Sequence, residues 1–72
     1  MKIVRVFIER GKDGSYGAYM PDENNLSYGV IGDGNTADAA KADFMATYEA
    51  MRQGAAEEGR EFEEVEFVFS FD

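Results

Sequence analysis

DGSYGAYMPD at residues 13–22 and GDGNT at residues 32–36 are the two runs of sequence that decide the fold. The glycines of the first run allow the positive φ angles of a tight hairpin turn, and the aromatic run Tyr16–Met20 is typical of a strand. Pro21 cannot donate a hydrogen bond to a ladder, so the strand should stop there. The hydroxyl of Thr36 can accept a hydrogen bond from the first amides of a helix. The two runs therefore predict a turn, a strand, a second turn and the start of a helix.

Strand patterns continue on both sides of these runs. Lys2–Arg10 is rich in Val, Ile and Phe and predicts a first strand. Leu26–Ile31 predicts a third strand, which Gly32 and Gly34 should end. In Val65–Asp72, three phenylalanines recur at every second position, with other side chains between them. This pattern predicts a last strand with one buried face.

The segment after Thr36 has the spacing of a helix with one apolar face. We expect the helix to end between Gly54 and Gly59, because glycine is the favoured residue just beyond a helix. The residues predicted to face the core are Ala37, Ala40, Phe44, Tyr48, Met51 and Ala55, with Met45 beside them.

The element order β-β-β-α-β predicts an α+β fold in two layers, with one helix on one face of a four-stranded mixed sheet. The last strand should lie parallel to the first and beside it, because the helix acts as the crossover. Residues 1–72 then form a single domain. One helix covers one face only, so Ile3, Phe7, Tyr19 and Ile31 should form an apolar patch on the other, as a partner or dimer interface. The alternative is that a long side chain or the C-terminal loop covers this patch.

Composition narrows the classes of function. The 72 residues include no Cys and no His, so neither a disulfide nor a zinc site with imidazole or thiolate ligands can reinforce this small domain. We therefore expect a homodimer or a larger assembly. The net charge of −8 argues against direct binding of nucleic acid and favours a basic protein partner. The sequence indicates neither a signal peptide nor a membrane span, and we expect a cytoplasmic protein.

The charge is also uneven along the chain. Residues 57–72 contain seven acidic residues and one basic residue, whereas residues 1–12 contain four basic residues and one acidic residue. Either these segments neutralise each other across neighbouring strands, or the acidic segment is a docking surface for a basic partner.

The order of turn, aromatic strand, Pro-Asp and a Gly-Asp turn opening a helix resembles the N-terminal domain of HicB-family antitoxins. The resemblance spans roughly residues 2–59 and rests on Asp13, Gly14, Tyr16, Ala18, Pro21, Asp22, Gly32, Asp33, Thr36, Ala39 and Ala40. It implies a truncated RNase H-like fold and a non-enzymatic protein. Such a protein would bind a small basic HicA-type ribonuclease toxin and block its RNA-binding surface or its catalytic histidine. We expect a stand-alone HicB-like domain without the DNA-binding domain that full antitoxins append.

The sequence is also compatible with two other classes of function. Asp13, Asp22 and Asp33 could hold Mg²⁺ in an RNase H-like nuclease, although each lies in a turn where Asp is favoured for local hydrogen bonds. Alternatively, Phe7, Tyr16 and Tyr19 could stack on the bases of single-stranded RNA. The negative net charge of the chain disfavours such binding. We expect no catalytic residue, no cofactor and no metal, and a self-associating domain with an unknown partner is the alternative to an antitoxin.

Overall fold

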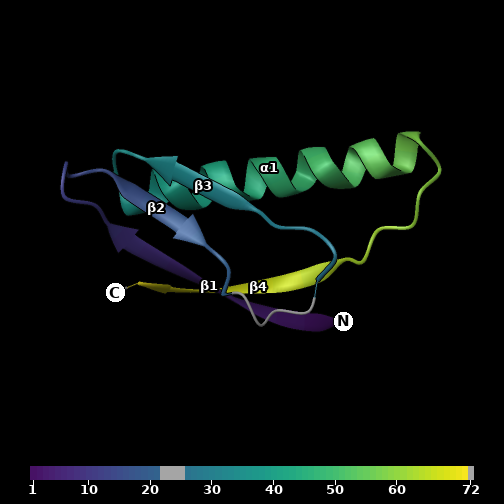
Figure 1. Ribbon diagram of the computed structural model, residues 1–72, viewed down its shortest axis with the longest axis horizontal. Helices are drawn as coiled ribbons and strands as arrows, with labels where there is room; N and C mark the ends of the chain where they lie inside the picture. The colour runs from purple at the N-terminus through teal and green to yellow at the C-terminus, as the bar shows by residue number, and fades with distance from the viewer. Residues whose placement is uncertain (22–25, 72) are drawn as a thin grey trace.

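The computed structural model describes residues 1–21 and 26–71, which form a mixed sheet with one helix packed on it (Figure 1). The elements in chain order are β1 (Lys2–Arg10), β2 (Tyr16–Tyr19), β3 (Ile31–Gly34), α1 (Ala37–Glu57) and β4 (Val65–Phe71). The strand order across the sheet is β3-β2-β1-β4. β1 pairs with β2 and β2 with β3 in antiparallel fashion, whereas β1 and β4 are parallel. The predicted α+β class and the parallel pairing of the first and last strands are confirmed.

The β1–β2 hairpin turn is held by local hydrogen bonds. Gly14 has a φ of 87°, which a residue without Cβ adopts at little cost. The amide of Gly11 donates to the Ser15 carbonyl over 2.7 Å, and the Asp13 carboxylate accepts from both the amide and the hydroxyl of Ser15. These two bonds lower the pKa of Asp13. The role of Asp13 in the structure is thus to stabilise the turn.

β3 lies further along the chain than the sequence predicted. It spans Ile31–Gly34, whereas the prediction was Leu26–Ile31, and the two glycines expected to end the strand lie within it. A Cβ on Gly32 would lie 2.4 Å from the backbone nitrogen of Phe44, and one on Gly34 would lie 2.6 Å from the Cβ of Ala39. Glycine is therefore required here because the strand and the helix approach each other closely.

Both ends of α1 are capped by hydrogen bonds from residues that flank the helix. The Thr36 hydroxyl accepts from the amide of Ala39 over 3.0 Å, which confirms the predicted N-cap. At the other end Gly59 has a φ of 69°, and its amide donates to the Ala56 carbonyl. The next amide, that of Arg60, donates to the Ala55 carbonyl, which completes a Schellman motif. The helix ends between Gly54 and Gly59, as predicted.

The core lies between α1 and one face of the sheet. Phe44 is fully buried and makes edge-to-face contacts with Phe67 and Phe69 of β4, at centroid distances of 4.9 and 5.6 Å. The other residues of the core cluster are Val4, Val6, Ile8, Ala18, Val30, Ala40, Tyr48 and Val65. Within the described part of the chain, no helix combines the length and apolar composition that crossing a membrane requires.

Candidate interaction surface

The sheet face opposite α1 carries exposed apolar side chains from all four strands, with the charged side chains of Arg5 and Glu66 among them. We call it the open sheet face, and its apolar members are Ile3, Phe7, Tyr19, Ile31 and Val68. The register sets Ile31 beside Tyr19, Tyr19 beside Phe7 and Phe7 beside Ser70, so one row crosses the whole sheet. Ile31 is 73% exposed, Ile3 65% and Val68 48%. Exposed apolar side chains gathered on one face of a small domain are typical of an interface.

An aromatic pair lies at the centre of this row. The rings of Phe7 and Tyr19 are 5.9 Å apart between centroids and tilted by 43°. The Tyr19 hydroxyl donates to a Glu9 carboxylate oxygen over 2.6 Å, which fixes the ring against its neighbour. A tyrosine held in this way presents apolar area with little further loss of side-chain entropy on binding.

The sequence predicted four of the five members of this surface. Ile3, Phe7, Tyr19 and Ile31 all lie on the same face of the sheet, as strand alternation required. Val68 was not among the predicted interface residues. Its position out of phase with the phenylalanines of β4 was the signal that could have identified it.

The structure does not bring together the residues predicted for RNA stacking, and among the described residues it shows no group of carboxylates that could hold Mg²⁺. Tyr16 points to the helix side of the sheet, where its ring lies 5.9 Å from that of Phe71, so it is separated from Phe7 and Tyr19. The amide of Asp33 donates to the carboxylate of Asp43 over 2.9 Å. Asp22 lies outside the described residues. Among residues 1–21 and 26–71, no three His, Cys, Asp or Glu side chains form a group that could hold a metal ion.

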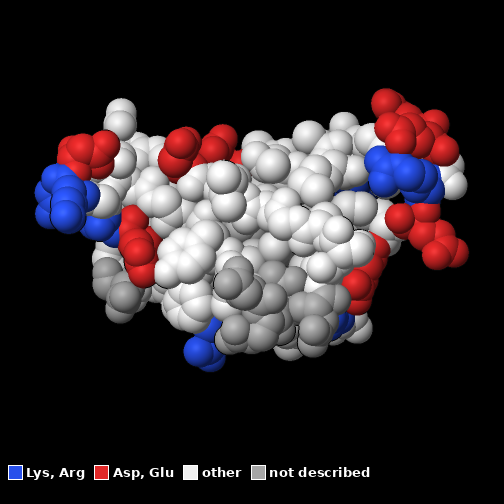
Figure 2. All heavy atoms as spheres, in the orientation of Figure 1, with Lys and Arg blue, Asp and Glu red and all other residues white. Residues whose placement is uncertain are grey.

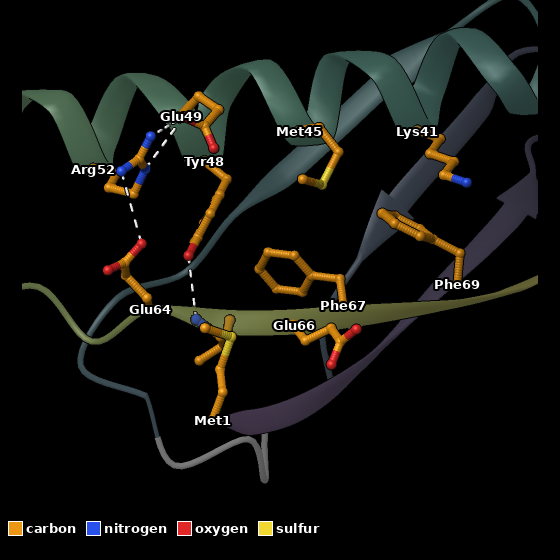
Figure 3. A pocket seen from close by; sticks show the side chains of 11 residues that line it. Met1, Lys41, Met45, Tyr48, Glu49, Arg52, Glu64, Glu66, Phe67 and Phe69 are labelled. Atoms are coloured by element: carbon orange, nitrogen blue, oxygen red, sulfur yellow. Dashed lines mark hydrogen bonds and ion pairs between the residues drawn. The ribbon is translucent and has the colours of Figure 1, made fainter.

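A concave surface that the sequence did not predict lies between α1 and β4. This α1–β4 groove has a volume of about 570 Å³. In Figure 3, Phe67 and Phe69 point from β4 toward the helix, while Lys41 and Met45 point from the helix toward the strand. The Lys41 ammonium lies 4.9 Å from the centroid of the Phe69 ring, a cation–π contact.

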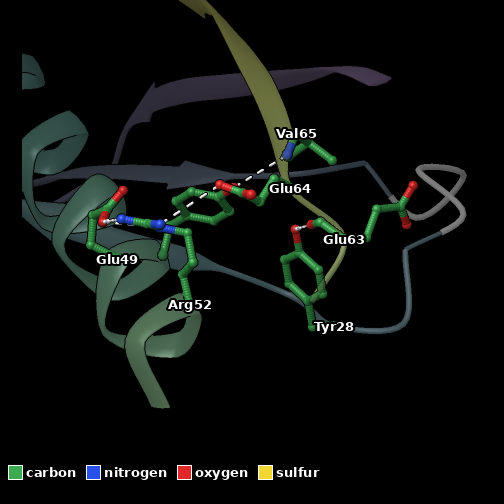
Figure 4. A network of polar contacts seen from close by, with 7 residues as sticks. Tyr28, Glu49, Arg52, Glu63, Glu64 and Val65 are labelled. Atoms are coloured by element: carbon green, nitrogen blue, oxygen red, sulfur yellow. Dashed lines mark hydrogen bonds and ion pairs between the residues drawn. The ribbon is translucent and has the colours of Figure 1, made fainter. Parts of the chain in front are cut away.

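Polar contacts close one end of this groove (Figure 4). Arg52 contacts Glu49 at 2.7 Å and Glu64 at 3.7 Å, so it joins the helix to the segment before β4. The hydrogen bond to Glu49 raises the pKa of Arg52. The amide of Val65 donates to the Tyr48 hydroxyl over 3.2 Å. These contacts fix the start of β4 against the helix.

Tyr28, in the segment before β3, also contacts the segment before β4. The Tyr28 hydroxyl donates to the Glu63 carbonyl over 2.8 Å, and its ring stacks on Phe62 at 4.8 Å. Burial, together with Tyr48 and Glu63, raises the pKa of Tyr28 to about 12. Tyr28 therefore stays protonated and remains a hydrogen-bond donor throughout the neutral range.

The charged side chains visible in Figure 2 gather at the two ends of the molecule, and uncharged residues occupy much of the middle. Arg60 pairs with Glu58 at 2.6 Å, so its positive charge is locally balanced. The chain as a whole carries a net charge of −8.

In comparisons with models of protein families, with curated proteins and with solved structures, no significant match to this chain is found.

Proposed function

We propose that this chain is a protein-binding module of the HicB-like antitoxin type. It would dock a small basic HicA-type ribonuclease toxin and neutralise it by occlusion. The observation that carries the binding part of this proposal is the open sheet face, where Ile31 and Ile3 are 73% and 65% exposed. The resemblance of residues 2–59 to HicB antitoxins supports the choice of partner.

Apolar area and charge would have different roles in such a complex. Burial of Ile3, Phe7, Tyr19, Ile31 and Val68 would remove apolar surface from water, which is the main source of affinity in protein association. The net charge of −8 would speed encounter with a basic protein and disfavour nucleic acid. The neutralising step then requires no catalytic residue, metal or cofactor from this chain.

The test combines binding with inhibition. The small basic protein encoded beside the gene would be purified, and its ribonuclease activity measured with increasing amounts of this chain. We expect a stoichiometric complex by calorimetry and loss of ribonuclease activity. A neighbouring protein with no affinity for this chain, or a complex that still cleaves RNA, would refute the antitoxin proposal.

A matched pair of variants locates the surface. Ile31→Glu places a charge on the open sheet face, whereas Ala46→Glu places the same charge on an exposed position of α1. We expect Ile31→Glu to weaken binding about tenfold or more, because a charge desolvated without a partner is costly. Ala46→Glu should bind and inhibit as the unmodified chain does. Equal affinities for the two variants would show that the partner docks elsewhere.

A further inference from the structure

The two edges of the sheet differ in how they are protected. β3 is four residues long, contains two glycines, and its Asp33 amide is capped by Asp43 from the helix. β4 is seven residues long, with neither Gly nor Pro, and Glu66 is its single charged residue. Short strands, capped amides and charges are the devices that prevent pairing at an edge. β3 is short and its Asp33 amide is capped, whereas β4 is longer and has these devices at its start, where Tyr48 caps the Val65 amide and Glu66 is charged.

The backbone of β4 is oriented for pairing on its outer side. β4 pairs with β1 on one side, and no other described strand lies on its second side. The Val65 amide donates to Tyr48, so it points away from β1. Backbone donors and acceptors alternate in direction along a strand, so Phe67 and Phe69 present their N–H and C=O groups to the same outer side.

The distribution of charge favours an antiparallel second copy of this chain. Glu61, Glu63, Glu64 and Glu66 lie in or before the first half of β4, residues 67–71 are uncharged, and the acidic Asp72 follows them in the sequence. In an antiparallel pair about Val68, Glu66 of one strand lies opposite the uncharged Ser70 of the other. In a parallel pair, like charges would lie side by side, which destabilises a sheet.

We propose that two copies of this chain pair antiparallel along their β4 edges, about a twofold axis at Val68. This register brings Val68 opposite Val68, Phe67 opposite Phe69 and Glu66 opposite Ser70. The two four-stranded sheets then become one continuous sheet, with both helices on the same face. The Phe67 and Phe69 rings of each copy extend the apolar floor of the other copy's α1–β4 groove, next to Met45.

Edge pairing also has a consequence for the open sheet face. Val68 belongs to this face and lies at the proposed axis, so the open faces of the two copies join there into one larger surface. Dimerisation therefore leaves Ile3, Tyr19 and Ile31 accessible for a different partner. This inference does not depend on the antitoxin proposal, because a chain that fails to bind a toxin can still form this dimer.

The test uses charge substitutions at the axis, followed by light scattering after size-exclusion chromatography at high micromolar concentration. We expect the unmodified chain to be a dimer. Val68→Lys and Val68→Glu should each be monomeric, because each places like charges opposite one another. An equimolar mixture of the two variants should regain the dimer mass. Circular dichroism would verify that both variants are folded.

A control separates the edge from the open face. Ile3→Lys introduces the same charge as Val68→Lys at an exposed position of β1, away from the edge, and should remain dimeric. A monomeric unmodified chain would overturn the proposal. So would a mixture of the two Val68 variants that stays monomeric, or a monomeric Ile3→Lys beside a dimeric Val68→Lys. Binding of only an extended basic peptide at β4, with no self-association, would assign the edge to another partner and also overturn it.

Discussion

The two faces of the sheet are built by the same alternation but have opposite environments. In β1, Val4, Val6 and Ile8 are at most 4% exposed because α1 covers them. Ile3 lies in the same strand with the opposite orientation and is 65% exposed. Apolar side chains therefore stabilise this domain only where a second layer covers them. On the uncovered face, apolar side chains such as Ile3 stay exposed to solvent.

The largest expected effect is at the centre of the covered face. Phe44→Ala removes a fully buried ring that contacts Phe67 and Phe69, and should lower the free energy of unfolding by about 3–5 kcal/mol. Phe71→Ala is the matched control, since Phe71 is 63% exposed, and it should cost about 1 kcal/mol or less. Urea denaturation measures both. Equal losses would mean that burial by α1 does not distinguish these two rings.

The second effect tests how closely the layers approach. Gly32→Ala places a methyl group against the backbone of Phe44 and Ala40, and should destabilise the domain by about 1–3 kcal/mol. Gly29→Ala introduces the same methyl group where no atom lies within 4 Å, and serves as the control. Thermal unfolding compares the two variants. A Gly32→Ala variant as stable as Gly29→Ala would argue against the tight packing of β3 on α1.

The smallest effect is expected on the open sheet face. Ile3→Ala should change the free energy of unfolding by about 0.5 kcal/mol or less, because Ile3 is largely exposed. Val4→Ala, one residue along the same strand, should cost about 2 kcal/mol. Denaturation at low protein concentration gives both values. A cost at Ile3 as large as that at Val4 would mean that another surface covers Ile3 in solution.

Features set by local chemistry could be predicted from the sequence. Alternation assigned Ile3, Phe7, Tyr19 and Ile31 to one face, and the Thr36 hydroxyl identified the start of the helix. Both signals depend on residues close together in the chain, where side-chain direction and hydrogen bonding follow from spacing alone. The function of the open sheet face stays a prediction, because exposure alone does not identify a partner.

Features set by distant contacts could not be predicted in this way. From the sequence, Gly32 and Gly34 predicted the end of a strand. In the structure they lie within the strand, because the helix packs too closely against them for a side chain to fit, and that contact involves residues further along the chain. The α1–β4 groove depends on where α1 lies over the sheet, and the contact of Tyr48 with Val65 contributes to this position. Neither the crossing of helix and sheet nor the open β4 edge has a local sequence signal.

The parallel pairing of β1 with β4 also constrains the order in which the domain can form during synthesis. β1 leaves the ribosome before β2, β3 and α1, and its β4 neighbour follows only after all of them. The β1–β2 hairpin can form early because its contacts are local, whereas the β1–β4 ladder must close a long loop. Val4 and Val6 therefore stay without their Phe67 and Phe69 neighbours until translation has passed β4. A nascent chain at that stage exposes apolar strand surface and an unpaired strand edge, which makes it prone to aggregation.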